Sequence, residues 1–153
     1  MIEFPNEESK WSWLAGITDS DSCLCVIRNH DILTRRGFSF RPTAKFEQTN
    51  KEFIEEVRNV ASVKSKIIHI KSYKGQKPLW AVTLCSTELR NVLPKIIPFL
   101  IKKKPQAVLL LEAAMLLKEH YPNHTPHDKR LGEIYEALHS LNEKGKHKEV
   151  FEK

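Results

Sequence analysis

The stretch Trp13-Leu14-Ala15-Gly16-Ile17-Thr18-Asp19-Ser20-Asp21-Ser22 determines how the rest of this 153-residue chain is interpreted. Apolar residues recur at helical spacing up to this point, so we expect a helix from about Glu7 to Asp19. That helix ends in two acidic residues, although the helix dipole makes carboxylates unfavourable at a C-terminal end. Two carboxylates kept there are typical of a site for a divalent cation, which prefers oxygen ligands. Ala15 and Gly16 are small enough to let a second helix approach closely.

Length and composition indicate one soluble, globular domain over residues 1–153. The chain is long enough to bury its own core, and 41% of its residues are hydrophobic against 29% charged. No apolar run approaches the length of a membrane span, because Glu112 interrupts the longest candidate, from Ala107 to Leu117.

The N-terminal residues and the cysteines indicate an intracellular protein. Glu7 and Glu8 stand where a signal peptide would be basic. Cys23, Cys25 and Cys85 are an odd number of cysteines without Cys-x-x-Cys spacing. We therefore expect reduced, buried thiols in a protein that is not secreted. It would work in the cytoplasm or nucleoid of a prokaryote, or in an organelle.

The net charge of +6 is concentrated in two parts of the chain. Segments 22–49 and 64–85, which we expect to form strands, hold ten lysines and arginines and only two acidic residues. The remaining residues are close to neutral overall. A basic sheet on a nearly neutral helical body is the charge distribution of a nucleic-acid-binding protein. The alternative is a basic face that only keeps the protein in solution.

Periodicity and capping signals predict an alternation of helices and strands. After the first helix we expect strands over 22–28 and 38–48, a helix over 51–61 capped by Thr49 or Asn50, strands over 66–73 and 79–85, and a helix capped by Ser86 or Thr87. A helix over 106–120 and a last helix over about 128–141 complete the chain, with a frayed, charged tail.

Alternation within the strands predicts one core face and one outward face. In segment 38–48 the core face would hold Phe38, Phe40, Pro42, Ala44 and Phe46, and the outward face Ser39, Arg41, Thr43, Lys45 and Glu47. In segment 66–73 we expect Ile68 and Ile70 to face the core, and His69, Lys71 and Tyr73 to face outward.

Residues 14–22 resemble the motif of the LAGLIDADG homing endonucleases. Leu-Ala-Gly at 14–16 matches the first three letters, residues 17 and 18 fill the two apolar positions, and Asp19 and Asp21 match the two acids. The chain departs from the motif at Thr18, Ser20 and Ser22, the last of which replaces a glycine. The predicted order of elements also resembles the family's αββαββα core over about residues 8–120. That core is an α+β fold with a four-stranded antiparallel DNA-binding sheet, to which this chain would add C-terminal helices.

The resemblance implies an endonuclease that uses Mg²⁺, with Mn²⁺ as an expected substitute, to hydrolyse phosphodiester bonds. Asp21 matches the metal-binding acid of the family, and the backbone carbonyl of Ser20 matches a further metal ligand. Asp19 matches the first acid, which is more often a helix-end cap than a ligand.

Two further catalytic positions follow from the same resemblance. Asn50 matches a polar residue after the second strand, with Gln48 as a neighbouring alternative. Lys103 matches a lysine before the fourth helix, although Lys102 or Lys104 would fill that position if the alignment shifted by one residue.

The outward strand residues would bind double-stranded DNA in the major groove. The candidates are Arg35, Arg36, Ser39, Arg41, Thr43, Lys45, Glu47, His69, Lys71 and Tyr73. The single motif resembles that of family members which form homodimers through their motif helices, and it implies a long, pseudo-palindromic target. The interface candidates are Trp13, Leu14, Ala15, Gly16 and Ile17.

The leading hypothesis is therefore an intron-encoded, site-specific endonuclease that cuts both DNA strands as a homodimer. One alternative is a maturase-like RNA-binding protein that keeps the fold and assists splicing of its own intron. Another is a DNA-binding relative whose cleavage activity has decayed, which Ser22 in place of glycine leaves open. Asp21 and Lys103 favour an active nuclease.

Overall fold

The computed structural model describes residues 2–30, 37–71, 74–118 and 127–151. The elements are α1 (Glu7–Asp21), β1 (Ser22–His30), β2 (Phe38–Gln48), α2 (Lys51–Ala61), β3 (Ile68–Ile70), β4 (Leu79–Leu84), α3 (Ser86–Ile96), the 3₁₀ helix η1 (Ile97–Phe99), α4 (Lys104–Leu116) and α5 (Asp128–Phe151). The four strands form one antiparallel sheet in the order β1-β2-β4-β3. The predicted α+β class and its αββαββα order are confirmed. No helix within these described ranges is long and apolar enough to cross a membrane.

Asparagine side chains cap the first two helices, and Asn50 does so as predicted. The side chains of Asn6 and Asn50 accept hydrogen bonds from the third backbone N–H groups of α1 and α2, at 2.7 and 3.2 Å. The prediction that Ser86 or Thr87 caps α3 is wrong, because the capping position is Cys85 and no side-chain bond closes it. The prediction that the last helix ends near residue 141 is also wrong, since α5 continues to Phe151 through lysines and glutamates that favour helix.

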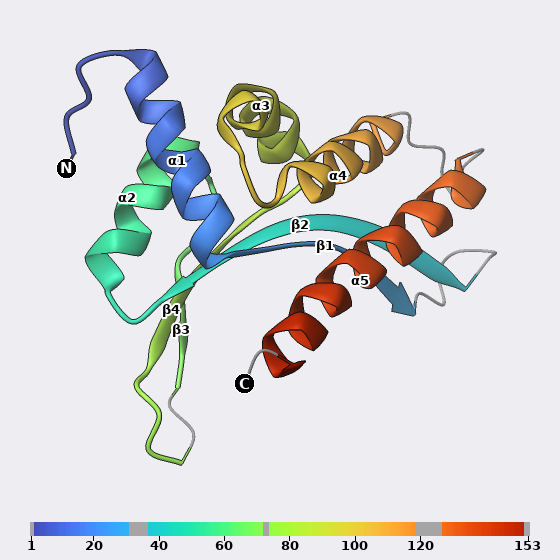
Figure 1. Cartoon of the computed structure of the whole chain (residues 1–153). Helices are drawn as coiled ribbons and strands as arrows, with labels where there is room; N and C mark the ends of the chain where they lie inside the picture. Colours follow the sequence, from blue (N-terminus) through green and yellow to red (C-terminus); the bar gives the residue numbers. More distant parts are fainter. Residues whose placement is uncertain (1, 31–36, 72–73, 119–126, 152–153) are drawn as a thin grey trace.

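The core lies between one face of the sheet and the helices. In Figure 1, α1, α3 and α4 lie above β1 and β2, and α5 crosses in front of these two strands. The sheet contributes buried side chains from alternating strand positions: Leu24, Val26, Phe40, Ala44, Phe46, Val82 and Leu84. The apolar faces of the helices contribute Leu14, Ala15, Ile54, Val57, Leu89, Leu93, Leu110 and Leu131. The predicted alternation of β2 is confirmed, because Phe40, Pro42, Ala44 and Phe46 are buried while Arg41 is exposed.

The outer face of the sheet points away from this core. We call it the open face and define it by Cys23, Cys25 and Ile27 of β1 and by Ser39, Arg41, Thr43, Lys45 and Glu47 of β2, which the strand register places on the same side. On β4, Thr83 and Ala81 pair with Lys45 and Glu47 and continue the open face. The open face is therefore a surface with basic and uncharged side chains and one acidic side chain, Glu47, among the residues that define it.

The predicted orientation of β3 is wrong. His69 pairs with Trp80 and stacks on its ring, with the centroids 4.3 Å apart, and Trp80 packs against the core. Ile68 pairs with Ala81 on the open face and is 59% exposed. The sequence Ile67-Ile68-His69-Ile70 fits either register of a strand. The stacking of His69 and the packing of Ile67 against the core decide the register.

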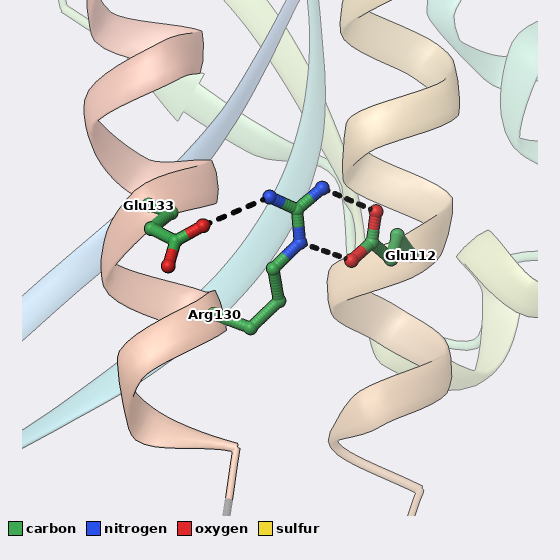
Figure 2. Close-up of polar contacts among 3 residues, drawn as sticks. All are labelled: Glu112, Arg130 and Glu133. Carbon is green, nitrogen blue, oxygen red and sulfur yellow. Dashed lines mark hydrogen bonds and ion pairs between the residues drawn. The ribbon is translucent and has the colours of Figure 1, made fainter.

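The C-terminal helix α5 is fixed to the rest of the fold at two places. Figure 2 shows the Arg130 guanidinium of α5 between the carboxylates of Glu112 on α4 and Glu133 on α5, with contacts of 2.8 and 3.2 Å. Arg130 holds the pKa of Glu112 below its usual range. Near the other end of α5, the Asn142 amide donates to the carbonyl of Leu24 at 3.1 Å. Because β1 is an edge strand, this contact covers backbone that would otherwise be open to pairing with another chain.

Candidate active site

Asp21 is the last residue of α1, and its carboxylate is exposed where the helix meets the sheet. It lines an open hollow together with Ser22, Cys23, Lys45 and Glu47. Strand pairing explains why these residues line the same hollow, since Ser22 and Cys23 begin β1 directly opposite Phe46 and Lys45 of β2. The end of the motif helix thus reaches the edge of the open face.

Asp19 has a different and structural role. Its carboxylate accepts hydrogen bonds from the backbone N–H groups of Ile101, Lys102 and Lys103, at 2.9, 3.1 and 2.8 Å. These three donors belong to the turn that leads into α4. Asp19 therefore fixes the start of α4 against the end of α1, and it acts as a cap, as its match to the first motif acid implies.

Lys103 is the lysine that this turn directs toward Asp21. Its ammonium donates to the backbone carbonyl of Ser22, and its side chain is half-buried, whereas Lys102 and Lys104 are exposed. Burial lowers the pKa of the Lys103 ammonium, and the neighbouring Cys23, Asp19 and Asp21 oppose that shift. Lys103 thus lies beside the hollow, because Ser22 is one of the residues that line it.

The structure does not bring Asn50 to this hollow. The Asn50 amide oxygen accepts from the N–H of Phe53 as the cap of α2, and Asn50 lines a different hollow with Ile2 and Phe53. The alternative, Gln48, accepts from the N–H of Thr49. The polar side chains of β2 that do line the hollow of Asp21 are Lys45 and Glu47, which form an ion pair of 2.6 Å. Their position follows from the pairing of β1 with β2, which the sequence alone did not predict.

The remaining DNA-contact candidates are distributed unevenly. Arg41 and Lys45 lie on the open face, Ser39 is half-buried there, and Thr43 is almost fully buried at 2% exposure. His69 lies on the opposite side of the sheet with Trp80, and Lys71 is exposed just after β3. Arg35, Arg36 and Tyr73 lie outside the described residues.

Most of the predicted interface side chains are buried within the chain itself. Leu14 and Ala15 are fully buried and Ile17 is 8% exposed, so these three cannot offer side chains to a second copy. Trp13 packs against Phe4 and Phe53, with ring centroids 5.6 and 6.1 Å away. The three buried side chains serve the core of their own chain because they lie on the inner side of α1, and a dimer interface along this helix stays a prediction.

The exposed side of α1 is a line of small residues. Ser12, Gly16 and Ser20 are exposed and follow one another at four-residue spacing. The Ser12 and Ser20 hydroxyls bond back to the carbonyls of Glu8 and Gly16, at 2.8 and 3.0 Å. A Cβ added at Gly16 would meet nothing within 4 Å. We call Ser12, Gly16 and Ser20 the small-residue face of α1.

The oxygen atoms at the hollow suit a hard cation only in part. Asp21 and Glu47 supply carboxylates, and the carbonyls at the end of α1 have no further helical turn to bond them. Within the described part of the chain, no three His, Cys, Asp or Glu side chains gather closely enough to hold a metal ion. The residues of one copy therefore fit a cation that takes its other ligands from water, a bound phosphate or a second copy.

The role of Asp19 gives a direct stability prediction. Replacing Asp19 with Asn removes the charge and leaves one acceptor oxygen for three N–H donors, so the free energy of unfolding should fall by roughly 1–3 kcal/mol. Urea denaturation followed by circular dichroism measures this change. Ser20→Ala, which alters an exposed hydroxyl one residue away, is the matched control and should change stability far less. Equal effects of the two substitutions would contradict the capping role.

No family model and no curated protein matches this sequence. Solved structures do match it. The archaeal intron-encoded homing endonuclease I-Vdi141I, complexed with DNA, superposes with a TM-score of 0.73 and 22% identity over 89% of this chain and 86% of that one. The homing endonuclease I-CvuI, in complex with a DNA target in the presence of Mg, gives 0.68 and 18% over 88% and 83%. The I-LtrWI LAGLIDADG homing endonuclease, bound to target DNA, gives 0.61 and 14% over 74% and 39%.

Proposed function

Because the chain has the fold of the LAGLIDADG homing endonucleases, we propose that it is a site-specific DNA endonuclease that works as a homodimer with a divalent metal ion. One observation carries the proposal. The motif acid Asp21 is exposed at the end of α1, in a hollow at the edge of the open face of the sheet, with Lys103 beside it.

The open face would carry the DNA. An antiparallel ribbon fits the major groove, where Arg binds guanine in a bidentate manner and Lys and Arg anchor phosphates. Arg41 is exposed on this face, and Lys45, further along the same strand, lines the hollow and forms an ion pair with Glu47. DNA on this face passes directly beside Asp21, so recognition and cleavage would occur on one continuous surface.

The hollow would be where the phosphodiester bond is hydrolysed. A divalent cation bound there supplies an activated water and neutralises charge on the phosphate. Asp21 would bind the cation, with the carbonyl of Ser20 and the carboxylate of Glu47 as further oxygen donors. Lys103 would place its positive charge next to the phosphate, since the Ser22 carbonyl and the turn fixed by Asp19 hold its side chain in place.

Cutting both strands needs two such hollows, and one copy provides one motif acid cluster. The small-residue face of α1 offers the surface for a second copy, since two helices can approach closely where Ser12, Gly16 and Ser20 leave no side-chain bulk. Contact at Gly16 would bring two Asp21 residues, one from each copy, toward a common axis. The homodimer would then read a long, roughly palindromic target.

The placement of DNA is tested with two arginines on opposite faces of the same sheet. Arg41→Ala should weaken binding to duplex DNA, by roughly 1–3 kcal/mol if Arg41 contacts a base. Arg28→Ala is the matched control, because the Arg28 guanidinium lies over the Phe38 ring at 4.2 Å on the helix-covered side of the sheet. Fluorescence anisotropy with labelled duplexes measures both affinities. Equal losses of affinity in the two variants, or a loss of affinity only in Arg28→Ala, would place DNA elsewhere on the protein.

A further inference from the structure

Two of the three free cysteines lie next to each other on the open face. Cys23 is exposed and lines the hollow of Asp21, and Cys25 is half-buried two residues further along β1. The expectation that the three thiols are buried is therefore wrong, since Cys23 is exposed and the other two are half-buried. In the sheet, Cys23 pairs with Lys45 and Cys25 pairs with Thr43. Both sulfur atoms thus lie on the surface proposed to bind DNA.

The surroundings of Cys25 favour the thiolate form. Its sulfur lies 3.3 Å from the Thr43 hydroxyl. A hydrogen bond from Cys23, with smaller contributions from Thr43, Lys45 and Arg41, lowers the pKa of Cys25 to about 6 against the opposing effect of burial. A hydroxyl 3.3 Å away, a neighbouring thiol and the charges of Lys45 and Arg41 around one half-buried sulfur are features of a reactive cysteine rather than a core cysteine.

Cys85 provides an internal comparison. It is half-buried, follows β4 and occupies the capping position of α3. It does not line the hollow and lies beyond the last paired residue of β4, Leu84, so the same chain carries a comparison cysteine outside the paired strands.

We propose that Cys25 is a modification site for low-molecular-weight disulfides, and that the resulting mixed disulfide prevents DNA from occupying the open face. The second half of this inference rests on the proposed function. The partner is defined by its chemistry: a small, water-soluble disulfide whose halves carry negative charge, such as glutathione disulfide.

The reaction is a thiol–disulfide exchange. The Cys25 thiolate attacks one sulfur of the small disulfide, so a new S–S bond forms while the original S–S bond breaks. The other half leaves as a thiolate and takes a proton from water. Cys25 is oxidised and the leaving half is reduced, so no further oxidant is needed. The same exchange with an added thiol reverses the modification.

A disulfide between Cys23 and Cys25 is a poor end product. Residues two apart on an extended strand have Cα atoms separated by roughly 6.7 Å, near the upper limit for a disulfide. Closing that bond would also distort β1 where it pairs with β2. The mixed disulfide therefore persists, and it adds bulk and negative charge between Arg41 and Lys45, where a DNA phosphate would otherwise be attracted.

The reactive thiol is identified by mass spectrometry. Reduced protein is incubated with glutathione disulfide, and the adduct is located by intact mass and peptide mapping in the wild type, Cys25→Ser and Cys85→Ser. We expect rapid modification at Cys25 in the wild type and in Cys85→Ser, and none at comparable rate in Cys25→Ser. Thr43→Val, which keeps the shape and removes the hydroxyl, should slow the reaction. Modification of Cys25→Ser at the wild-type rate would overturn the assignment.

The effect of the mixed disulfide on DNA binding is measured by comparing the affinity of each modified protein with that of the same protein in its reduced form. Fluorescence anisotropy with a generic duplex at low salt should show that the adduct weakens binding about tenfold or more, because its negative charge repels the DNA phosphates on the open face. Reduction of the adduct with dithiothreitol should restore the affinity. Circular dichroism checks that the fold is retained. An adduct at Cys25 that leaves affinity unchanged would overturn the inference. A reduced protein that binds no duplex would instead contradict the proposed function, and the mass data would still decide whether Cys25 is the reactive thiol.

Discussion

Asp21→Asn is expected to bind duplex DNA almost as well as the wild type and to cut neither strand. The substitution keeps the size of the side chain but removes the charge that would hold the cation, and Asp21 is exposed, so the fold does not depend on it. Binding is followed by anisotropy and cleavage by gel electrophoresis, both with Mg²⁺ present.

The same substitution should slightly stabilise the protein. A carboxylate at the last residue of α1 faces the negative end of the helix dipole, so its neutralisation should raise the free energy of unfolding by roughly 0.3–1 kcal/mol. Lost activity together with a small gain in stability is typical of a residue kept for function. Cleavage by Asp21→Asn at near the wild-type rate would show that Asp21 is not the metal ligand.

Gly16→Leu is expected to abolish cleavage by separating the two copies while each copy remains folded. Gly16 is exposed at the middle of the small-residue face, and a Cβ there meets nothing within 4 Å of its own chain. The leucine therefore disturbs only a neighbouring helix, and its bulk should keep the two α1 helices and their Asp21 residues apart. Sedimentation velocity at micromolar concentration should show a monomer or a weakened dimer.

Gly132→Leu is the matched control for this experiment. Gly132 is also a helical glycine, in α5, and a Cβ there also meets nothing within 4 Å. Both substitutions remove a glycine from a helix, which should preserve or raise stability by up to about 1 kcal/mol. Only Gly16→Leu should change the sedimentation coefficient. A wild type that is strictly monomeric, even with target DNA bound, would contradict the homodimer.

The sequence predicted well the features that depend on strong local patterns. The alternation of β2 is unambiguous over eleven residues, so its core face was predicted correctly, whereas Thr43 of the predicted outward face is buried. The motif located Asp21 at the end of α1, and its first acid, Asp19, caps the turn before α4. The three-residue strand β3 contains apolar residues on both sides, so periodicity could not choose its register.

The features that the sequence did not predict depend on contacts between distant segments. Leu14 and Ala15 fit either a dimer interface or a core, and only the packing of α1 against the sheet shows that they are buried. Asn50 was predicted both to cap α2 and to act in catalysis. Its amide does cap α2, but it lies outside the hollow of Asp21, whose lining depends on the pairing of β1 with β2. Glu47 was predicted to face outward, and its position beside Asp21 follows from the pairing of Lys45 with Cys23.

The most direct test of the central claim is cleavage of a plasmid library that carries many different duplex sequences. The protein is incubated with the library and Mg²⁺, and the ends of the linear products are sequenced, with EDTA and with Asp21→Asn as controls. We expect breaks in both strands at a small set of related, roughly palindromic sites, and none in either control. Plasmids that stay intact at every protein concentration, or breaks that share no sequence and are still made by Asp21→Asn, would contradict it.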